Sequence, residues 1–572
     1  MRSDLVLHLA PADAERVEAV AEHARRESWA ERLVDHDTTL WSSDPAVQEA
    51  IAGRLGWLDA PAHFALEVPA LEGFGDGVRV AGFTTAVVMG MGGSSLAPEV
   101  LGEVFGSAEG YLDLRILDST DPAAVAATVD DLDPLQTLWI VASKSGTTTE
   151  PLAFMADAWA RVEAALHRHG SDQRPGEFFV AITDPGRSLD AIPHQDDLRE
   201  RFLNLPTVGG RYSALTYVGL VPASLIGLDL DALLASAQAM LARCREPEPE
   251  ANPGIHLGIA IGELARAGRD KLTLLADPAI ASFGGWLEQL IAESTGKHGT
   301  GIVPVDREPL LDAQAYGPDR AFVRLALRDA DDGGRAALAN ELAALGHPVI
   351  ELSIEDPIDL AAEAIRWEVA TAIAGAVLGI DPFDQPNVEE AKELTRRVLA
   401  GAGSGTGAAA SSHPADTRDP DAFDTTPSNL ETLAAHLGKA LHGLRPPQYI
   451  AIQAFIAPAA ARNAAIDGLR RTLATTGCAT TAGYGPRFLH STGQLHKGGP
   501  STGVFLQLTG GHPKDRQIPG WPYTFGRLID AQAHGDREAL TAHDRPVIHV
   551  DLGPDVDAGL AALGRALERA LA

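Results

Sequence analysis

Hydroxyl side chains crowd one short stretch of the chain, directly after an apolar run. Residues 138–142 (LWIVA) are apolar, and the next seven positions hold Ser143, Ser145, Thr147, Thr148 and Thr149. A single helix N-cap needs only one hydroxyl, so this stretch carries more donors than capping requires. The surplus predicts an anion site in residues 143–149, called the Ser/Thr loop below. A monophosphate is the anion that such a loop suits best.

Two neighbours in the loop strengthen this prediction. Lys144 adds a mobile positive charge, and Gly146 lets the backbone approach a ligand closely. The GxxxxGK[ST] pattern of a P-loop is absent, so a nucleotide with its metal ion is not predicted here.

The elements on either side must position this loop. Residues 138–142 predict a short buried strand, and the Ala-rich segment after Pro151 predicts a helix. The loop therefore lies at a strand-to-helix turn. Free backbone N–H groups and the positive end of the helix dipole favour a bound anion at such a turn.

A second polar loop closes an earlier predicted strand. Residues 90–95 (GMGGSS) combine glycines, which permit a tight turn, with two serines at the start of the next predicted helix. In an open parallel sheet, loops at the carboxyl ends of neighbouring strands form one crevice, where ligands usually bind. The two loops together favour a sugar phosphate as the ligand.

The same residues permit an alternative. Gly90 and Gly92 begin a dinucleotide-binding pattern, and Asp118 lies about where a ribose-binding acid would be expected. The third glycine or alanine of that pattern is Ser95 here, and the Ser/Thr loop is no part of it. An NAD(P)-dependent oxidoreductase therefore stays as the second hypothesis.

Two further residues could supply electrostatic and acid–base chemistry. Arg211 follows two glycines, which allow the backbone to bend so that a guanidinium can point into a cleft and stabilise negative oxygen. Glu293 lies near the end of a predicted helix, where a carboxylate could act as a general base. Taken alone, Arg211 is more often a surface residue after a turn, and Glu293 is more often an ordinary helix-terminal residue.

Composition limits the partners. The chain has 572 residues and a formal net charge of −32, which disfavours nucleic acid and anionic membranes. A sugar-phosphate site must therefore carry its own local Lys and Arg. Cys244 and Cys478 are too few for a disulfide framework or a zinc cluster, so a reducing compartment is expected. No signal-peptide core and no segment of transmembrane length are evident, and we expect a cytoplasmic protein.

Alternating predicted strands and helices indicate an α/β protein with doubly wound parallel sheets. We expect a helical lead-in over residues 1–60, a first α/β domain with the phosphate site over 61–250, and a second over 251–400. Residues 401–430 are rich in Gly, Ser, Ala, Pro and Asp and predict a flexible linker. Residues 431–572 could form a domain of their own or complete the second sheet; they offer only two strand candidates, which favours completion of the second sheet.

Five motifs, in this order, resemble the phosphoglucose isomerase family: GMGGSSLAP, SKSGTTTEP, VGGRYS, AESTGK and PFDQPNVEEAK. They span residues 90–392. The family interconverts glucose 6-phosphate and fructose 6-phosphate, a step of glycolysis and gluconeogenesis. The resemblance implies two α/β domains of the sugar isomerase (SIS) type, a homodimer, and no metal or other cofactor.

The resemblance also implies roles for single residues. Arg211 would steady the enediolate, and Glu293 would carry the proton between C1 and C2 with Gln289 nearby. Lys392 matches the family's lysine that helps to open the sugar ring. The residues implied to hold the phosphate and the adjoining sugar are Ser143, Lys144, Ser145, Thr147, Thr148, Gly93 and Ser94.

One part of the family pattern is missing. Many members carry a catalytic histidine between the ESTGK-like and FDQ-like motifs and donate it to the partner subunit's site, but here that interval holds only His298 and His347. Residues 488–503 (FLHSTGQLHKGGPSTG) resemble the isomerase half of bacterial bifunctional transaldolase–phosphoglucose isomerases, which suggests a functional link to a transaldolase. We predict that His490 opens the ring, with His496 as the alternative. No carboxylate or Cys neighbours them, so a metal site is not predicted.

Two questions of function stay open at this point. A non-catalytic SIS regulator that binds phosphosugars would keep the Ser/Thr loop but would not need Glu293 and Lys392 together. An isomerase could also accept mannose 6-phosphate, because C2 epimers differ only in the face that loses its proton.

Overall fold

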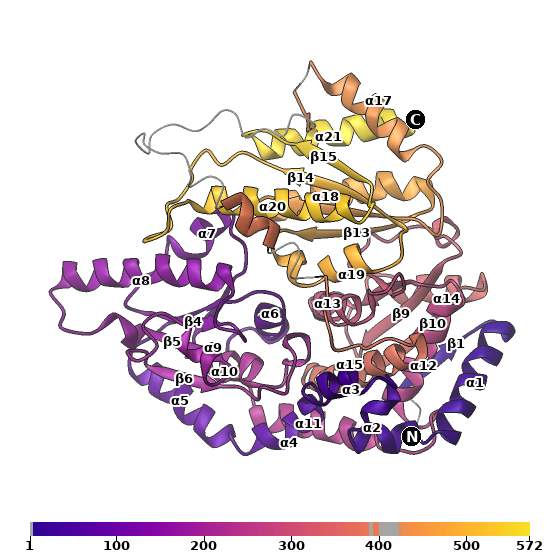
Figure 1. The fold of residues 1–572 in the computed structure, drawn as a ribbon, viewed down its shortest axis with the longest axis horizontal. Coiled ribbons are helices and arrows are strands. Elements are labelled where there is room, and N and C mark those ends of the chain that lie inside the picture. The colour runs from indigo at the N-terminus through magenta and orange to yellow at the C-terminus, as the bar shows by residue number, and fades with distance from the viewer. Residues whose placement is uncertain (1–3, 388–392, 400–421, 427) are drawn as a thin grey trace.

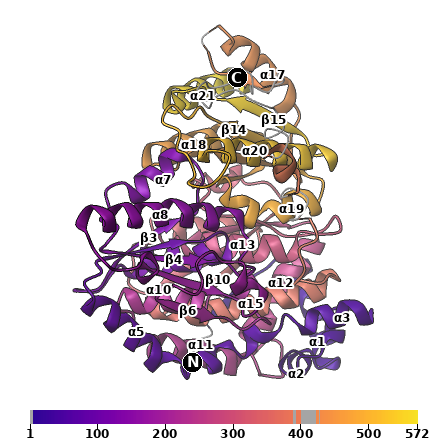
Figure 2. The ribbon, with the colours of Figure 1, turned by 60° about the vertical axis from the view of Figure 1, so that its left-hand side comes forward.

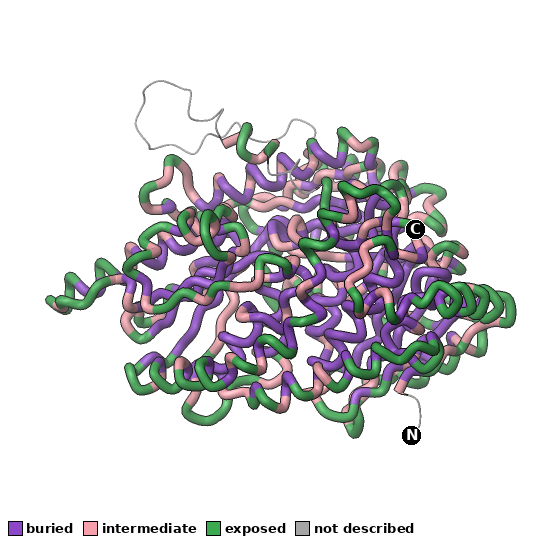
Figure 3. The backbone as a smooth tube through the Cα atoms, turned by 60° about the horizontal axis from the view of Figure 1, so that its bottom comes forward, coloured by how far each residue is buried: buried purple, intermediate pink, exposed green. Residues whose placement is uncertain are grey.

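The computed structural model describes residues 4–387, 393–399, 422–426 and 428–572. Within these residues the strands form three separate five-stranded sheets. Figures 1 and 2 show the first two sheets and their helices side by side, with the third sheet and its helices lying across both. The tube in Figure 3 is mostly buried in the interior of the molecule and exposed at its outer coils and turns.

The first sheet has the order β3-β2-β4-β5-β6, and all its strands are parallel. Every residue of β2, β4 and β5 is buried, as expected for parallel strands covered by helices on both faces. The strands are β2 (Thr85–Met89), β3 (Asp113–Leu117), β4 (Thr137–Ala142), β5 (Phe179–Thr183) and β6 (Glu200–Leu203). Its helices are α5 (Val68–Val80), α6 (Gly93–Phe105), α7 (Pro122–Val129), α8 (Thr149–His169), α9 (Arg187–Asp190) and α10 (Tyr217–Leu225).

The second sheet has the order β1-β10-β9-β7-β8. Its strands are parallel except for β1 (Leu5–His8), which pairs antiparallel with β10. The remaining strands are β7 (Lys271–Ala276), β8 (Val303–Val305), β9 (Arg320–Leu327) and β10 (Val349–Ile354). Its helices are α11 (Leu230–Arg243), α12 (Pro253–Arg266), α13 (Phe283–Thr295), α14 (Arg335–Ala344) and α15 (Leu360–Leu378).

The N-terminal segment corrects one expectation. It is mainly helical, with α1 (Pro11–Arg26), α2 (Trp29–Val34), α3 (Pro45–Ala52) and α4 (Ala60–Ala65). It also supplies β1 as an edge strand of the second sheet, with Leu5 opposite Leu352. The sequence of β1, LVLH, is too short for a clear alternation, so the strand depends on a distant partner to form.

The C-terminal part, called the third region below (residues 422–426 and 428–572), does not complete the second sheet as expected. Its strands pair only among themselves, in the order β11-β15-β14-β12-β13, and all are parallel. They are β11 (Phe423–Asp424), β12 (Tyr449–Phe455), β13 (Ala479–Tyr484), β14 (Gly503–Thr509) and β15 (Val547–Asp551). The helices are α17 (Leu430–Leu441), α18 (Ala460–Leu473), α19 (Gly493–Gly498), α20 (Phe525–Ala542) and α21 (Val556–Leu571).

The expectation failed because three strands of the third region carry weak signals. β13 reads ATTAGY and β15 reads VIHVD, so neither is an apolar run. β11 lies inside the predicted 401–430 linker, yet Phe423 and Asp424 pair with β15. Residues 400–421 and 427 lie outside the described part, and the linker prediction is untested there.

Ionic and aromatic contacts dock the third region onto the other two. Arg487 donates to Glu99 in α6, and Arg470 donates to the backbone oxygens of Asp306 and Arg307 after β8. Phe525 stacks on Phe154 of α8 with ring centroids 6.0 Å apart. The third region is therefore held against both sheets.

The prediction of an α/β fold built on parallel sheets is confirmed. None of the helices in the described ranges has the length and apolar character needed to cross a bilayer.

Candidate active site

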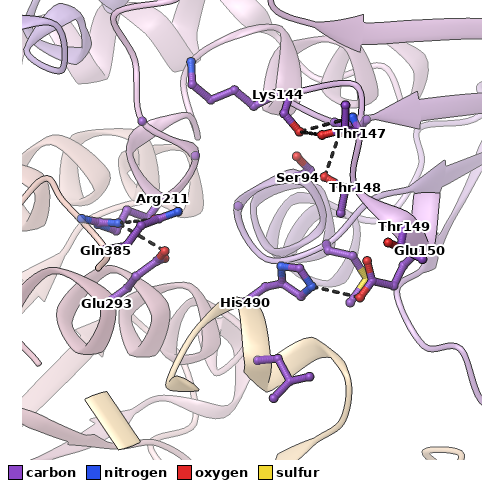
Figure 4. Close-up of a pocket in the computed structure, with 18 of the residues that line it drawn as sticks. Ser94, Lys144, Thr147, Thr148, Thr149, Glu150, Arg211, Glu293, Gln385 and His490 are labelled. Carbon is purple, nitrogen blue, oxygen red and sulfur yellow. Dashed lines mark hydrogen bonds and ion pairs between the residues drawn. The ribbon is translucent and has the colours of Figure 1, made fainter. Parts of the chain in front are cut away.

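A cavity of about 550 Å³ opens where the first sheet, the second sheet and the third region meet. Figure 4 shows that its side chains come from all three. Its lining includes, from the predicted set, Gly93, Ser94, Ser143, Lys144, Ser145, Thr147, Thr148, Arg211, Gln289, Glu293 and His490. The fold thus brings together these eleven residues, which the sequence placed in several separate motifs.

The Ser/Thr loop joins β4 to α8 and forms one wall of the cavity. Ser143 donates to Thr148 (Oγ to Oγ1, 2.9 Å), and the hydroxyls of Ser145 and Thr147 lie 2.9 Å apart. α8 begins at Thr149, two residues before Pro151, which a first helical turn accommodates. The loop therefore presents several hydroxyls at a helix N-terminus, as predicted.

Gly146 gives the loop its shape. Its φ is +66°, and a Cβ built there would lie 1.8 Å from the backbone oxygen of Ser188. No residue with a side chain fits this position without a shift of the loop or of α9.

Lys144 does not point toward the hydroxyls of the Ser/Thr loop, where its positive charge was predicted to help bind an anion. Lys144 turns away from the hydroxyls, as Figure 4 shows, and its Nζ donates to Asp184 (2.6 Å) and to the backbone oxygen of Pro206 (3.0 Å). Arg54 and Arg396 also line the cavity, although sequence reasoning missed both. These residues bring positive side chains to the cavity of a chain whose net charge is −32, and two of them are ion-paired, Lys144 with Asp184 and Arg396 with Glu393.

Tight backbone packing explains the glycines of the second loop. A Cβ on Gly93 would lie 2.0 Å from the backbone oxygen of Gly210, and one on Gly92 (φ +54°) would lie 2.5 Å from that of His490. Gly92 and Gly93 thus let the Arg211 turn and the His490 turn approach the second loop at the edge of the cavity.

Two positions of the dinucleotide pattern, Ser95 and Asp118, have other contacts in the structure. Ser95 is buried and donates to the backbone oxygen of Gly92 (3.2 Å). Asp118 faces Arg487, with 3.3 Å between Oδ2 and Nε, and burial raises the pKa of its carboxyl group. Asp118 is engaged by the third region rather than placed for a ribose.

Arg211 and Glu293 form the opposite wall. Arg211 lies in the short turn Gly210–Tyr212, Glu293 lies on α13, and Nη1 is 3.3 Å from Oε1. Arg211 also donates to Ser294 Oγ (2.8 Å) and to the backbone oxygens of Pro382 (2.8 Å) and Asp384 (2.9 Å). Both side chains are buried, so the guanidinium is held firmly beside the carboxylate (Figure 4).

Gln289 links this pair to the third region. Its Nε2 donates to Glu293 Oε2 (3.1 Å) and to the backbone oxygen of His490 (2.7 Å). One helical turn separates Gln289 from Glu293 on α13, which puts both on the same face.

His490 reaches the cavity from the turn Arg487–His490 of the same chain. Its Nε2 lies 3.1 Å from Glu150 Oε1, and Figure 4 shows the ring between Glu293 and Glu150. Glu150 was missed in the sequence because it reads as an ordinary acidic residue in the first turn of a helix. Its position directly after the Ser/Thr loop was the available signal.

The alternative histidine is not brought to the cavity. His496 is buried, with its ring 4.9 Å from that of Phe505 and 5.9 Å from that of Phe488. Burial lowers the pKa of His496 well below its usual value, so the ring is neutral. Its Nδ1 lies 3.2 Å from Gln453 Nε2 in the core of the third region, where it has a packing role.

Lys392 lies outside the described residues, so its assignment stays a prediction. Gln385 before it and Thr395 after it in the sequence both line the cavity. In the part of the chain that the structure covers, no group of three or more His, Cys, Asp or Glu side chains is arranged to hold a metal ion.

Comparisons with known proteins agree with the geometry of the cavity. The family model "Phosphoglucose isomerase" matches residues 70–304. The chain is 32% identical over 366 residues to a glucose-6-phosphate isomerase of Rubrobacter xylanophilus, an alignment that covers 56% of this chain and 83% of the relative. It is 31% identical over 404 residues to that of Symbiobacterium thermophilum, covering 61% and 87% of the two chains. The chain belongs to the phosphoglucose isomerase family.

Solved structures agree on the fold. A hypothetical protein from Thermus thermophilus superposes with a TM-score of 0.57 at 25% identity, covering 69% of this chain and all of the other. A glucose-6-phosphate isomerase from Chlamydia trachomatis gives 0.52 at 21% identity, covering 65% and 79%. The two relatives described above confirm the predicted membership of the phosphoglucose isomerase family. The family model ends at residue 304, before His490 and the third region.

Proposed function

We propose that this chain is a glucose-6-phosphate isomerase that interconverts glucose 6-phosphate and fructose 6-phosphate. One observation carries the proposal: in a phosphoglucose isomerase family member, the Ser/Thr loop faces the Arg211–Glu293 pair across a single cavity. One wall of the cavity can bind the phosphate of a sugar phosphate. The other wall can carry out acid–base chemistry on its first two carbons.

The phosphate end supplies orientation. Hydroxyls and N–H groups of the Ser/Thr loop would hold the phosphate, with Arg54 adding positive charge. Binding energy from this remote group then positions C1 and C2 beside Glu293.

The proton transfer follows from the other wall. Glu293 removes the proton from C2 of the open-chain aldose and returns it to C1, while a second proton moves from O2 to O1. Negative charge develops on these oxygens in the enediolate. Arg211, fixed by Ser294 and two backbone oxygens, stabilises that charge without having to reorganise.

Ring opening must come first, because the sugar rests as a closed ring. A proton leaves the O1 hydroxyl and another reaches the ring oxygen as the C1–O5 bond breaks. We assign this exchange to His490, which Glu150 orients, together with Lys392.

A direct assay tests the proposal. Fructose 6-phosphate should be converted to glucose 6-phosphate, detected by a coupled dehydrogenase and its NADP⁺, with no metal or cofactor added for the isomerase step itself. A phosphosugar-binding regulator would bind the sugar without turnover, and that result would contradict the proposal. Following the products by NMR shows in the same experiment whether mannose 6-phosphate forms.

Replacing His490 by Ala should lower kcat on glucose 6-phosphate by about a hundredfold, the scale of one general acid–base group. The loss should be much smaller on 4,5-dideoxyglucose 6-phosphate, which lacks both ring-forming hydroxyls and stays open. The His496→Ala variant serves as the control. Equal losses on both substrates, or a selective loss in His496→Ala, would remove His490 from ring opening.

The proposal also covers the cellular location, the oligomeric state and a functional partner of the enzyme. The family resemblance supports a cytoplasmic homodimer. The resemblance of residues 488–503 to bifunctional enzymes supports a functional link to a transaldolase.

The proposed dimer does not have to complete the cavity with a histidine, because His490 lines it from the same chain. We therefore expect the specific activity to stay constant when dilution dissociates any dimer, with the oligomeric state followed by mass photometry. Activity that falls in parallel with the dimer population would show that a partner subunit is needed.

A further inference from the structure

A short chain of buried hydrogen bonds leads from the first sheet to His490. Thr120 donates from Oγ1 to Gln532 Oε1 (2.7 Å), and Gln532 donates from Nε2 to Glu150 Oε1 (2.6 Å). The same Glu150 oxygen lies 3.1 Å from His490 Nε2. Thr120, Gln532 and Glu150 are 0%, 3% and 5% exposed, so the contacts among these three side chains are largely shielded from bulk water.

The donors and acceptors in this chain have a fixed direction. The amide nitrogen of Gln532 donates to a carboxylate oxygen of Glu150, so the amide oxygen of Gln532 faces the other way. Thr120 then donates to the amide oxygen that faces the other way. A reversed amide would place its oxygen against the carboxylate, which is unfavourable in a buried site.

This direction determines which nitrogen of His490 can react. In the tautomer whose Nε2–H donates to Glu150, the basic lone pair of the imidazole lies on Nδ1. Nδ1 is then the atom available to exchange a proton with the sugar ring.

α20 places Gln532 at this point. Phe525, Leu528 and Gln532 are spaced by three and four residues, so they share one face of the helix. Phe525 stacks on Phe154 of α8, and both Leu528 and Gln532 line the cavity. The docking of the third region thus sets the position of the amide.

We propose that Gln532 is a positioning residue for sugar ring opening: it holds Glu150 where this carboxylate fixes the orientation and tautomer of His490. The inference rests on the proposed function. Gln532 lies well beyond residues 70–304, so the family match does not assign it any role.

The first test is Gln532→Leu, assayed on glucose 6-phosphate and on 4,5-dideoxyglucose 6-phosphate. Loss of orientation should lower kcat on the cyclic sugar about tenfold, part of the contribution of one acid–base group, and leave kcat on the open sugar within about twofold. Gln507→Leu is the matched control. Gln507 is also buried in the third region, but its amide contacts Ala533 and Arg537 rather than Glu150.

A second pair keeps the test decisive if Gln532→Leu does not fold. Thr120→Ser retains the hydroxyl that orients the amide, and Thr120→Val removes it with little change in volume. We expect Thr120→Ser to match the wild type and Thr120→Val to lose about threefold in kcat on the cyclic sugar only, the scale of one hydrogen bond.

Each other outcome overturns the inference. These are equal losses on both sugars in Gln532→Leu, the same selective loss in Gln507→Leu, or equal impairment of the two Thr120 variants. His490→Ala, assayed in parallel, separates this proposal from the one it rests on. If His490→Ala shows no selective loss, the ring-opening assignment itself fails; if it does and Gln532→Leu does not, only the role of Gln532 fails.

Discussion

Replacing Glu293 by Gln should abolish isomerisation, lowering kcat by about 10²- to 10⁴-fold, the contribution of a general base. An amide cannot take the proton from C2. The shape of the side chain is kept, and Arg211 retains its contacts to Ser294, Pro382 and Asp384. Binding of glucose 6-phosphate, measured by calorimetry, should therefore stay near the wild-type value.

A second glutamate on the same helix is the matched control. Glu288 is half-buried and does not line the cavity. Burial raises the pKa of Glu288 to about 8, so its carboxyl group is mostly uncharged at neutral pH and Gln is a close substitute. Glu288→Gln should keep its turnover. Near-normal turnover in Glu293→Gln, or loss of C2-hydrogen exchange in both variants alike, would overturn the assignment of the base.

Replacing Gly146 by Ala should lower kcat/KM by about a hundredfold, because a displacement of 1 Å or so in a positioning element costs that much. Two effects combine. An L-residue at a φ of +66° costs about 1–2 kcal/mol, and the new Cβ would meet the Ser188 backbone oxygen at 1.8 Å. The loop must move, and the phosphate loses its cradle.

Gly186→Ala separates these two effects. Gly186 precedes α9, whose Ser188 lies against the loop, and has a similar φ of +70°, but nothing lies within 4 Å of its Cβ position. This control should cost stability with little loss of activity. Inhibition by inorganic phosphate gives a direct readout, since it should weaken in Gly146→Ala and persist in Gly186→Ala. Equal behaviour of the two variants would show that the shape of the Ser/Thr loop does not hold the phosphate.

Local sequence was sufficient to suggest much of the candidate site. The Ser/Thr loop, the second glycine-rich loop and the Arg211 turn each lie where a strand or turn meets a helix. Their chemistry follows from residue type and from the backbone N–H groups that such junctions leave free. Glu293 was proposed from its place near a helix end, and Gln289 came only with the family resemblance; the structure puts the two on one face of α13.

Other parts depended on contacts between residues far apart in the chain. The third sheet was missed because β11, β13 and β15 are short or polar and form only beside stronger strands. Glu150 and Gln532 were missed because each is unremarkable until α20 docks against α8 and brings the two side chains within 2.6 Å.

From the sequence by itself we could determine the parallel α/β class and the family, and predict the phosphate loop and the base, because these depend on short-range patterns of residue type. Only the tertiary structure decided which histidine enters the cavity. His490 and His496 lie in the same short segment but have different surroundings. His490 ends a turn that contacts Gln289 and Glu150. His496 is enclosed by Phe488 and Phe505. Which histidine lines the cavity depends on burial and on the docking of the third region, and neither can be read from a local sequence pattern.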